Sequence, residues 1–162
     1  MKLCVTTVLL LALLAGCGQQ VPRETLGNVM EEPQLPAPRE MAVDLPGEAA
    51  VPTMEQGDRR YYLCEDYEIT LERMPGGDLE STVKTLTGYE KQDLTLLETE
   101  APGARRYDFV WTTAGEQGQQ LGRAAVLDDG SYHYTLTVLR PAENTELLQV
   151  SWPQVFSSFR LV

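Results

Sequence analysis

The chain has 162 residues, with 24 acidic against 13 basic side chains and a formal net charge of −11. Sequence-independent binding to nucleic acid requires a basic surface, so we expect no nucleic-acid partner. One histidine and three cysteines leave little material for a structural zinc site, whereas a hydrophobic content of 43% is enough for a folded core.

The first sixteen residues have the form of a secretory signal peptide. Lys2 is followed by an uncharged stretch that reaches Ala15, shorter than the ~20 residues that span a bilayer. This stretch ends in Leu14-Ala15-Gly16-Cys17, which resembles the lipobox of bacterial lipoproteins. The resemblance implies cleavage before Cys17, lipidation of Cys17 and attachment to a membrane on its extracytoplasmic face. An ordinary cleaved signal, with no role for Cys17, is the alternative.

Residues 18–57 contain six of the ten prolines, several acidic residues and no Tyr, Phe or Trp. A stretch of this composition buries too little apolar surface to offset the entropy of ordering it. We therefore expect a lipidated cysteine and a disordered linker over 17–57, followed by a folded domain over 58–162.

The domain alternates apolar runs with turn residues. In chain order the pattern predicts strands at 61–63 and 67–72, a helix at 78–88, strands at 94–99, 105–113, 119–127 and 131–139, and a helix from 141 or 142 to 159. Pro153 predicts a kink or a fresh start near Trp152. These elements predict an α+β fold, an α-β-α sandwich in which an early and a C-terminal helix flank a mainly antiparallel sheet with a four-strand meander.

The order of these elements, with the closing Val-Phe-Ser-Ser-Phe-Arg-Leu at 155–161, resembles the PsbP-like superfamily, which includes Mog-type proteins and several bacterial lipoproteins. The resemblance covers residues 59–161. It implies a compact α-β-α domain that binds other macromolecules and has no shared catalytic residues. No calcium or manganese ligand pattern is carried over.

Few residues are candidates for chemistry. Cys64 is the remaining thiol once Cys4 is cleaved and Cys17 is lipidated; we expect a buried strand cysteine, with a reactive thiol as the alternative. His133 is expected to face solvent from a strand, with a general base or metal ligand as the alternative. The run 128–130, Asp-Asp-Gly, predicts a hairpin turn and lacks the calcium-loop pattern. We expect no cofactor and no metal.

Four aromatic residues are candidates for recognition: Tyr107, Trp111, Tyr132 and Tyr134. They are expected to form either an exposed recognition surface or a pocket between sheet and helix, and ordinary core packing is the alternative. The sequence thus favours a non-enzymatic, membrane-tethered extracytoplasmic protein that binds or helps to assemble another cell-envelope component. The alternatives are a small-ligand carrier with an aromatic pocket and, third, an enzyme that uses His133 or Cys64.

Overall fold

A computed structural model of the chain describes residues 35–115, 118–143 and 152–162. Cys17 and the lipobox lie outside the described residues. The elements in chain order are β1 (Met41–Ala42), η1 (Gly47–Ala49), β2 (Met54–Gln56), β3 (Arg59–Leu63), β4 (Glu68–Pro75), α1 (Leu79–Thr87), η2 (Lys91–Asp93), β5 (Leu97–Ala101), β6 (Ala104–Gly115), β7 (Gly118–Asp128), β8 (Tyr132–Pro141), α2 (Trp152–Ser158) and β9 (Arg160–Leu161).

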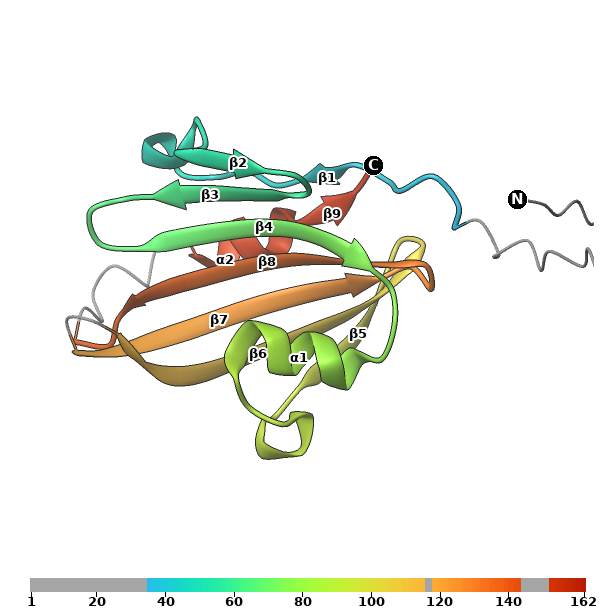
Figure 1. The fold of residues 1–162 in the computed structure, drawn as a ribbon. Coiled ribbons are helices and arrows are strands. Elements are labelled where there is room, and N and C mark those ends of the chain that lie inside the picture. The colour runs from blue at the N-terminus through green and yellow to red at the C-terminus, as the bar shows by residue number, and fades with distance from the viewer. Residues whose placement is uncertain (1–34, 116–117, 144–151) are drawn as a thin grey trace, which may run out of the picture. The chain divides into compact units, whose positions relative to one another are not determined.

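A seven-stranded sheet in the order β2-β3-β4-β8-β7-β6-β5 forms the centre of the fold (Figure 1). All neighbouring strands are antiparallel. The sheet has seven strands rather than the four of the predicted meander, because β4 pairs with β8, and β3 and β2 extend the sheet beyond β4. Ile69 and Leu71 of β4 pair with Val138 and Leu136 of β8, so the apolar side chains of both strands lie on the same side of the sheet. The α+β class with a mainly antiparallel sheet is confirmed.

The hairpin predicted at residues 128–130 is present between β7 and β8. Gly130 has a φ of 88°, which favours glycine, and its N–H donates to Asp128 Oδ1 at 2.8 Å. Asp129 Oδ1 accepts from Ser131 N at 2.9 Å and from Tyr132 N at 2.8 Å. The two aspartates thus act as turn residues.

Helix α1 lies where the sequence predicts it. Asp78 caps its first turn by accepting from Glu80 N at 3.2 Å, and Gly88 ends it at a φ of 79° with an N–H bond to Lys84 O. Buried Val83 packs with aromatic side chains of β6, so we call this side of the sheet the α1 face.

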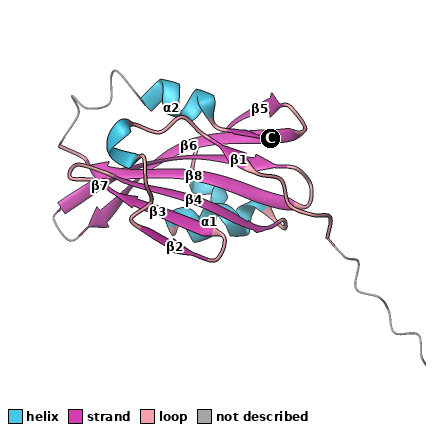
Figure 2. Ribbon diagram, turned by 90° about the horizontal axis from the view of Figure 1, so that it is seen from above, coloured by secondary structure: helices cyan, strands magenta, loops and turns pink. Residues whose placement is uncertain are grey.

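Helix α2 covers the opposite side, the α2 face (Figure 2). It begins at Trp152, whose ring meets Tyr67 edge-on at 4.8 Å between centroids, and it buries Phe156. The prediction of a helix from 141 or 142 is wrong at its start, because β8 continues to Pro141; residues 144–151 lie outside the described residues.

Residues 35–57, which were predicted to belong to the linker, are part of the folded unit that begins at Leu35. Met41, Val43 and Leu45 pack against the core under the α2 face, and Ala49 is buried. β1 pairs with β9 and β2 pairs with β3. The linker prediction is therefore corrected for residues 35–57, because three apolar side chains at alternate positions lie on one side of this segment. We call residues 35–50 the N-terminal segment.

Candidate functional site

The four aromatic residues predicted to act together lie on opposite faces of the sheet. Tyr107 and Trp111 of β6 pack under α1 with Val83. Tyr132 and Tyr134 of β8 pack on the other side, with the core beneath α2. Side chains alternate along each strand, and the register through β7 sends the two pairs in opposite directions. They do not line one pocket, and Tyr107, Trp111 and Tyr134 are core residues.

The hydroxyls of the two β8 tyrosines hold the N-terminal segment. Tyr134 Oη accepts from Arg39 N at 2.9 Å and donates to Asp129 Oδ2 at 2.9 Å. Tyr132 Oη donates to Pro36 O at 3.0 Å. The bonds to Arg39 and Pro36 join residues that are 95 or more positions apart in the sequence, so they fix where the chain enters the domain.

This cluster shifts two pKa values. Burial raises the pKa of the Tyr134 hydroxyl, the N–H of Arg39 lowers it and the Asp129 carboxylate raises it, with a net rise. Burial also acts to raise the pKa of Asp129. The N–H groups of Ser131 and Tyr132, together with the Tyr134 hydroxyl, outweigh burial and lower that pKa overall. The folded state therefore favours the ionised carboxylate form of Asp129.

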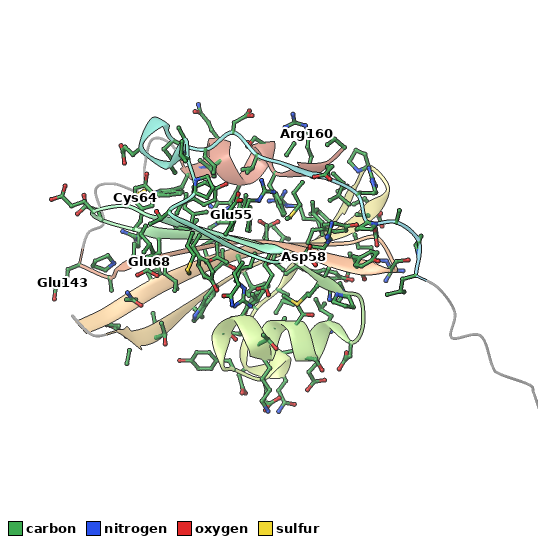
Figure 3. All side chains as sticks on the ribbon, turned by 45° about the horizontal axis from the view of Figure 1, so that its top comes forward. Glu55, Asp58, Cys64, Glu68, Glu143 and Arg160 are labelled. Atoms are coloured by element: carbon green, nitrogen blue, oxygen red, sulfur yellow. The ribbon has the colours of Figure 1, made fainter. Side chains whose placement is uncertain are left out.

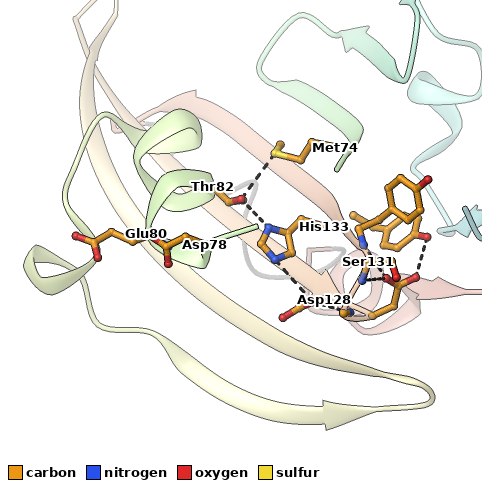
Figure 4. A network of polar contacts seen from close by, with 11 residues as sticks. Met74, Asp78, Glu80, Thr82, Asp128, Ser131 and His133 are labelled. Atoms are coloured by element: carbon orange, nitrogen blue, oxygen red, sulfur yellow. Dashed lines mark hydrogen bonds and ion pairs between the residues drawn. The ribbon is translucent and has the colours of Figure 1, made fainter. Parts of the chain in front are cut away.

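His133 lies in a buried polar network between β8 and α1 (Figure 4). Its Nδ1 is 2.6 Å from Thr82 Oγ1, its Nε2 is 3.7 Å from Asp128 Oδ1, and Thr82 Oγ1 also donates to Met74 Sδ at 3.8 Å. The prediction of a solvent-facing histidine is wrong, because α1 covers this side of β8 and leaves His133 only 1% exposed.

The same network places a hydroxyl, an imidazole and a carboxylate in the order used by nucleophilic triads. A nucleophile has to meet its substrate, however, and Thr82 is 5% exposed. The arrangement therefore serves packing: it connects the first turns of α1 to the sheet and satisfies the polar atoms of a buried histidine.

A cavity of about 430 Å³ lies at the end of the sheet where the β3–β4 turn meets the end of β8. Cys64 and Glu68 line it (Figure 3), and Gln119 and Arg140 are also among its lining residues. Cys64 is half-buried in the turn after β3, with its N–H bonded to Tyr67 O at 2.9 Å. The prediction of a buried strand cysteine is corrected accordingly.

Tyr67 joins this turn to the N-terminal segment. Its hydroxyl donates to Glu48 Oε2 at 2.8 Å. Burial raises the pKa of Tyr67, and hydrogen bonds with Cys64 and Glu48 raise it further. The Tyr67 hydroxyl therefore stays protonated at physiological pH and acts as a donor to Glu48.

Among the described residues, no helix covers the half of the α1 face nearest β2 (Figure 1), and no local sequence pattern predicts this. There Arg59 of β3 forms an ion pair with Glu72 of β4, and its guanidinium lies 5.7 Å from the centroid of the Tyr61 ring. Glu72, and then Tyr61, raise the pKa of Arg59 through their hydrogen bonds with it. Among the described residues, Thr137 Oγ1 and Arg59 Nε are buried without a hydrogen-bond partner. Exposed Met54 and Leu63 border this area.

No group of three or more His, Cys, Asp or Glu side chains in the described parts of the chain is placed to hold a metal ion. Within residues 35–115, 118–143 and 152–162, no helix has the length and apolar character needed to cross a membrane. Compared with models of known protein families, with curated protein sequences and with solved structures, the chain matches none. The resemblance to the PsbP-like superfamily stays a prediction.

Proposed function

We propose that this chain is a lipid-anchored extracytoplasmic protein whose folded domain binds or helps to assemble another component of the cell envelope. The observation that carries the proposal is the run Leu14-Ala15-Gly16-Cys17 at the end of an uncharged stretch of signal-peptide length. A diacylglyceryl group on Cys17 supplies two acyl chains, which is enough for stable anchoring.

The start of the folded unit at residue 35 bears on this function. Residues 18–34 separate the lipidated cysteine from the domain, which allows a reach of at most about 60 Å when fully extended. Had the linker continued to residue 57, the reach would have been more than twice as long. A short tether keeps the domain close to the bilayer and raises its effective concentration for partners that are themselves bound to the membrane.

The surface of the domain supports a role in binding. Residues 35–162 carry 21 acidic against 11 basic side chains, a balance that disfavours flat adsorption on anionic lipid. On the open half of the α1 face, Leu63 is 55% exposed and Met54 is 49% exposed. Exposed apolar side chains beside polar ones are typical of protein contacts, so we propose a protein rather than the lipid surface as the partner.

Two experiments test the proposal separately. Palmitate labelling that is lost in Cys17→Ala would support the anchor, and equal labelling of the two chains would contradict it. A photo-crosslinking amino acid at Leu63 should capture a defined envelope protein in living cells. The matched control is the same group at Val51, which is 76% exposed in the loop before β2. Equal patterns from the two positions would contradict a binding role for this face.

A further inference from the structure

Strand β6 extends well beyond its outer neighbour in the sheet. β6 has 12 residues, whereas β5 has 5 and pairs with β6 only as far as Asp108 (Figure 1). On the inner side, β7 pairs with β6 up to Gly115. Among the described residues, no strand therefore pairs with residues 109–115 of β6 on the outer side, and we call this stretch the free edge of β6.

The backbone groups of Val110, Thr112 and Ala114 point outward at the free edge. Along an antiparallel strand, successive residues bond alternately to one neighbouring strand and to the other. The N–H of Ala142 donates to Gln119 O at 2.8 Å, so the odd-numbered residues of β7 bond to β8 and its even-numbered residues bond to β6. The register of β7 with β6 then assigns the odd-numbered residues of β6 to β7 and the even-numbered residues to the outer side.

Most of these outward groups have no hydrogen-bond partner. The C=O of Thr112 accepts from Tyr89 Oη at 2.8 Å, as its outward direction allows. Within the described parts of the chain, the N–H and C=O of Val110 and Ala114 and the N–H of Thr112 form no hydrogen bond. The side chains of these three residues are exposed, Val110 by 57%. The free edge thus offers backbone donors and acceptors at the spacing of a strand.

The free edge also lacks the charges that protect exposed strands. Natural sheets discourage pairing with other chains by placing charged residues or proline on their edge strands. Here β2 carries Glu55, and β5 carries Glu98 and Glu100. Residues 109–115 read Phe-Val-Trp-Thr-Thr-Ala-Gly, which contains aromatic and β-branched residues and neither a charge nor a proline. This composition favours pairing with a further strand.

A groove of about 380 Å³ lies beside the free edge. Its lining residues are Tyr89, residues 112–115, Gly118 and Gln119, none of which is charged. Tyr89 follows the residue that ends α1, so the groove lies on the α1 side of the edge. A strand added here would direct every second side chain to that side and the others to the side of Val110. The groove therefore suits uncharged side chains at alternate positions of such a strand.

We propose that the free edge of β6 binds an extended segment of another protein, which adds to the sheet as a further strand beside residues 110–114. Backbone hydrogen bonds provide the pairing, and uncharged side chains at alternate positions occupy the groove. Met54 and Leu63 belong to β2 and β3 at the other end of the sheet. The inference therefore goes beyond the proposed function, and it does not depend on the lipid anchor.

A second copy of this chain is a poorer occupant of the free edge. Residues 35–162 carry 21 acidic against 11 basic side chains, so two copies repel each other. A copy that paired antiparallel about a two-fold axis would present Trp111 and Thr113 on the α1 side. Trp111 is 5% exposed and packs in the core beneath α1, so it is not available to fill the groove. An extended segment of a different protein has neither constraint.

The test begins with a phage-displayed library of random linear peptides, selected on the full chain in nonionic detergent. Synthetic peptides of the enriched sequences are then titrated against the chain by calorimetry. Thr112→Pro removes an outward N–H that has no partner in the fold and should weaken binding about tenfold or more. Glu98→Pro is the matched control, because Glu98 lies opposite Tyr107 and its N–H points away from β6; it should change binding less than about twofold.

Methylation of the peptide nitrogens gives a second readout on the unchanged chain. It keeps the proposal testable if Thr112→Pro fails to fold, which an unfolding curve would reveal. A methyl group on a residue that bonds to β6 should weaken binding about tenfold or more, and one on the next residue less than about threefold. The losses should therefore alternate along the peptide with a period of two residues.

Three results would overturn the proposal. The first is the absence of any enriched peptide that binds saturably. The second is a loss on methylation that does not alternate, or equal weakening by Thr112→Pro and Glu98→Pro. The third is a dimer of the full chain in sedimentation velocity that becomes a monomer in Thr112→Pro, which would assign the free edge to a second copy of this chain.

Discussion

The two faces of the sheet are covered in different ways. On the α2 face a helix and the N-terminal segment together close a core that includes Tyr134, Leu136 and Val138 of β8. In the part of the chain that the structure describes, α1 covers β6 to β8 on the α1 face, and no helix covers the β2–β4 side of that face (Figure 1). The N-terminal segment therefore takes the place on the α2 face that a second helix would occupy in a fully layered fold.

The two faces also differ in the contacts that hold α1 on one side, and α2 with the N-terminal segment on the other, against the sheet. The α1 side of β8 carries His133, Thr135 and Thr137, all buried, and α1 is connected to this row through Thr82. The α2 side of the same strand carries the core residues Tyr134, Leu136 and Val138, and also buried Arg140. Apolar burial contributes most of the stability, whereas polar networks depend on each partner being present. We therefore expect substitutions on the two faces to differ in how far they lower the free energy of unfolding and in the kind of interaction that they remove.

The largest effect is expected from deletion of residues 35–50, which removes the cover of Tyr62 and Leu71. The segment contributes buried Ala49 and three partly buried apolar side chains, worth about 5 kcal/mol out of the 5–15 kcal/mol typical of a domain. Thermal unfolding followed by circular dichroism should show a loss of the cooperative transition. Deletion of residues 18–34 is the control; if it destabilised the domain equally, the N-terminal segment would have no special role.

A smaller effect is expected from Phe156→Ala in α2. Phe156 is 1% exposed, so its truncation should cost about 3–5 kcal/mol. Val83→Ala in α1 removes less volume from an equally buried position and should cost about 1–3 kcal/mol. Chemical denaturation measures both free energies of unfolding. A larger cost for Val83→Ala would reverse our ranking of the two faces.

The polar connection of α1 is tested by Thr82→Val, which keeps the shape of the side chain and removes its hydroxyl. His133 Nδ1 would lose its partner, at a cost of about 1–3 kcal/mol. Exchange of the amide hydrogens of residues 79–87 should accelerate more than exchange in β4. Thr85→Val is the control, because Thr85 is exposed on the same helix and its hydroxyl bonds to Ser81 O. Equal effects of the two variants would show that the network does not hold the helix.

The smallest expected effect is a pH dependence of the free energy of unfolding that arises from Asp129. Its pKa is lowered from the ordinary value of 3.8, so the native state binds fewer protons than the unfolded chain in the window below that value. Its contribution to stability is present in full above the unfolded pKa and is lost as pH falls through the folded pKa. Asp129→Asn should flatten this part of the curve of unfolding free energy against pH. An unchanged slope in the variant would contradict the assigned role.

The regular hairpins and α1 could be predicted from the sequence because their signals are local. Asp78 and Gly88 mark both ends of the helix, and Asp-Asp-Gly marks the turn before β8. The pairing of β4 with β8 joins residues 57 to 71 positions apart, and no local pattern specifies it. The sheet was therefore predicted too narrow.

Two further features were not predicted correctly, each for its own reason. The alternation of Met41, Val43 and Leu45 was a strand-like signal, but proline and acidic neighbours outweighed it in the composition of residues 18–57. The burial of His133 depends on which face α1 covers, which strand alternation does not determine.

Amide hydrogen exchange of the N-terminal segment in the full chain tests the central claim most directly. Arg39 N bonds to Tyr134 Oη at 2.9 Å, Asp44 N to Ser158 Oγ at 2.8 Å, and Ala49 N to Pro46 O at 2.9 Å. If this segment completes the α2 face, the Arg39 and Asp44 amides should be protected to within about tenfold of the Val162 amide, which bonds to Glu40 O. Exchange of residues 35–50 at the rate of an unstructured peptide, with β4 and β8 still protected, would contradict the claim.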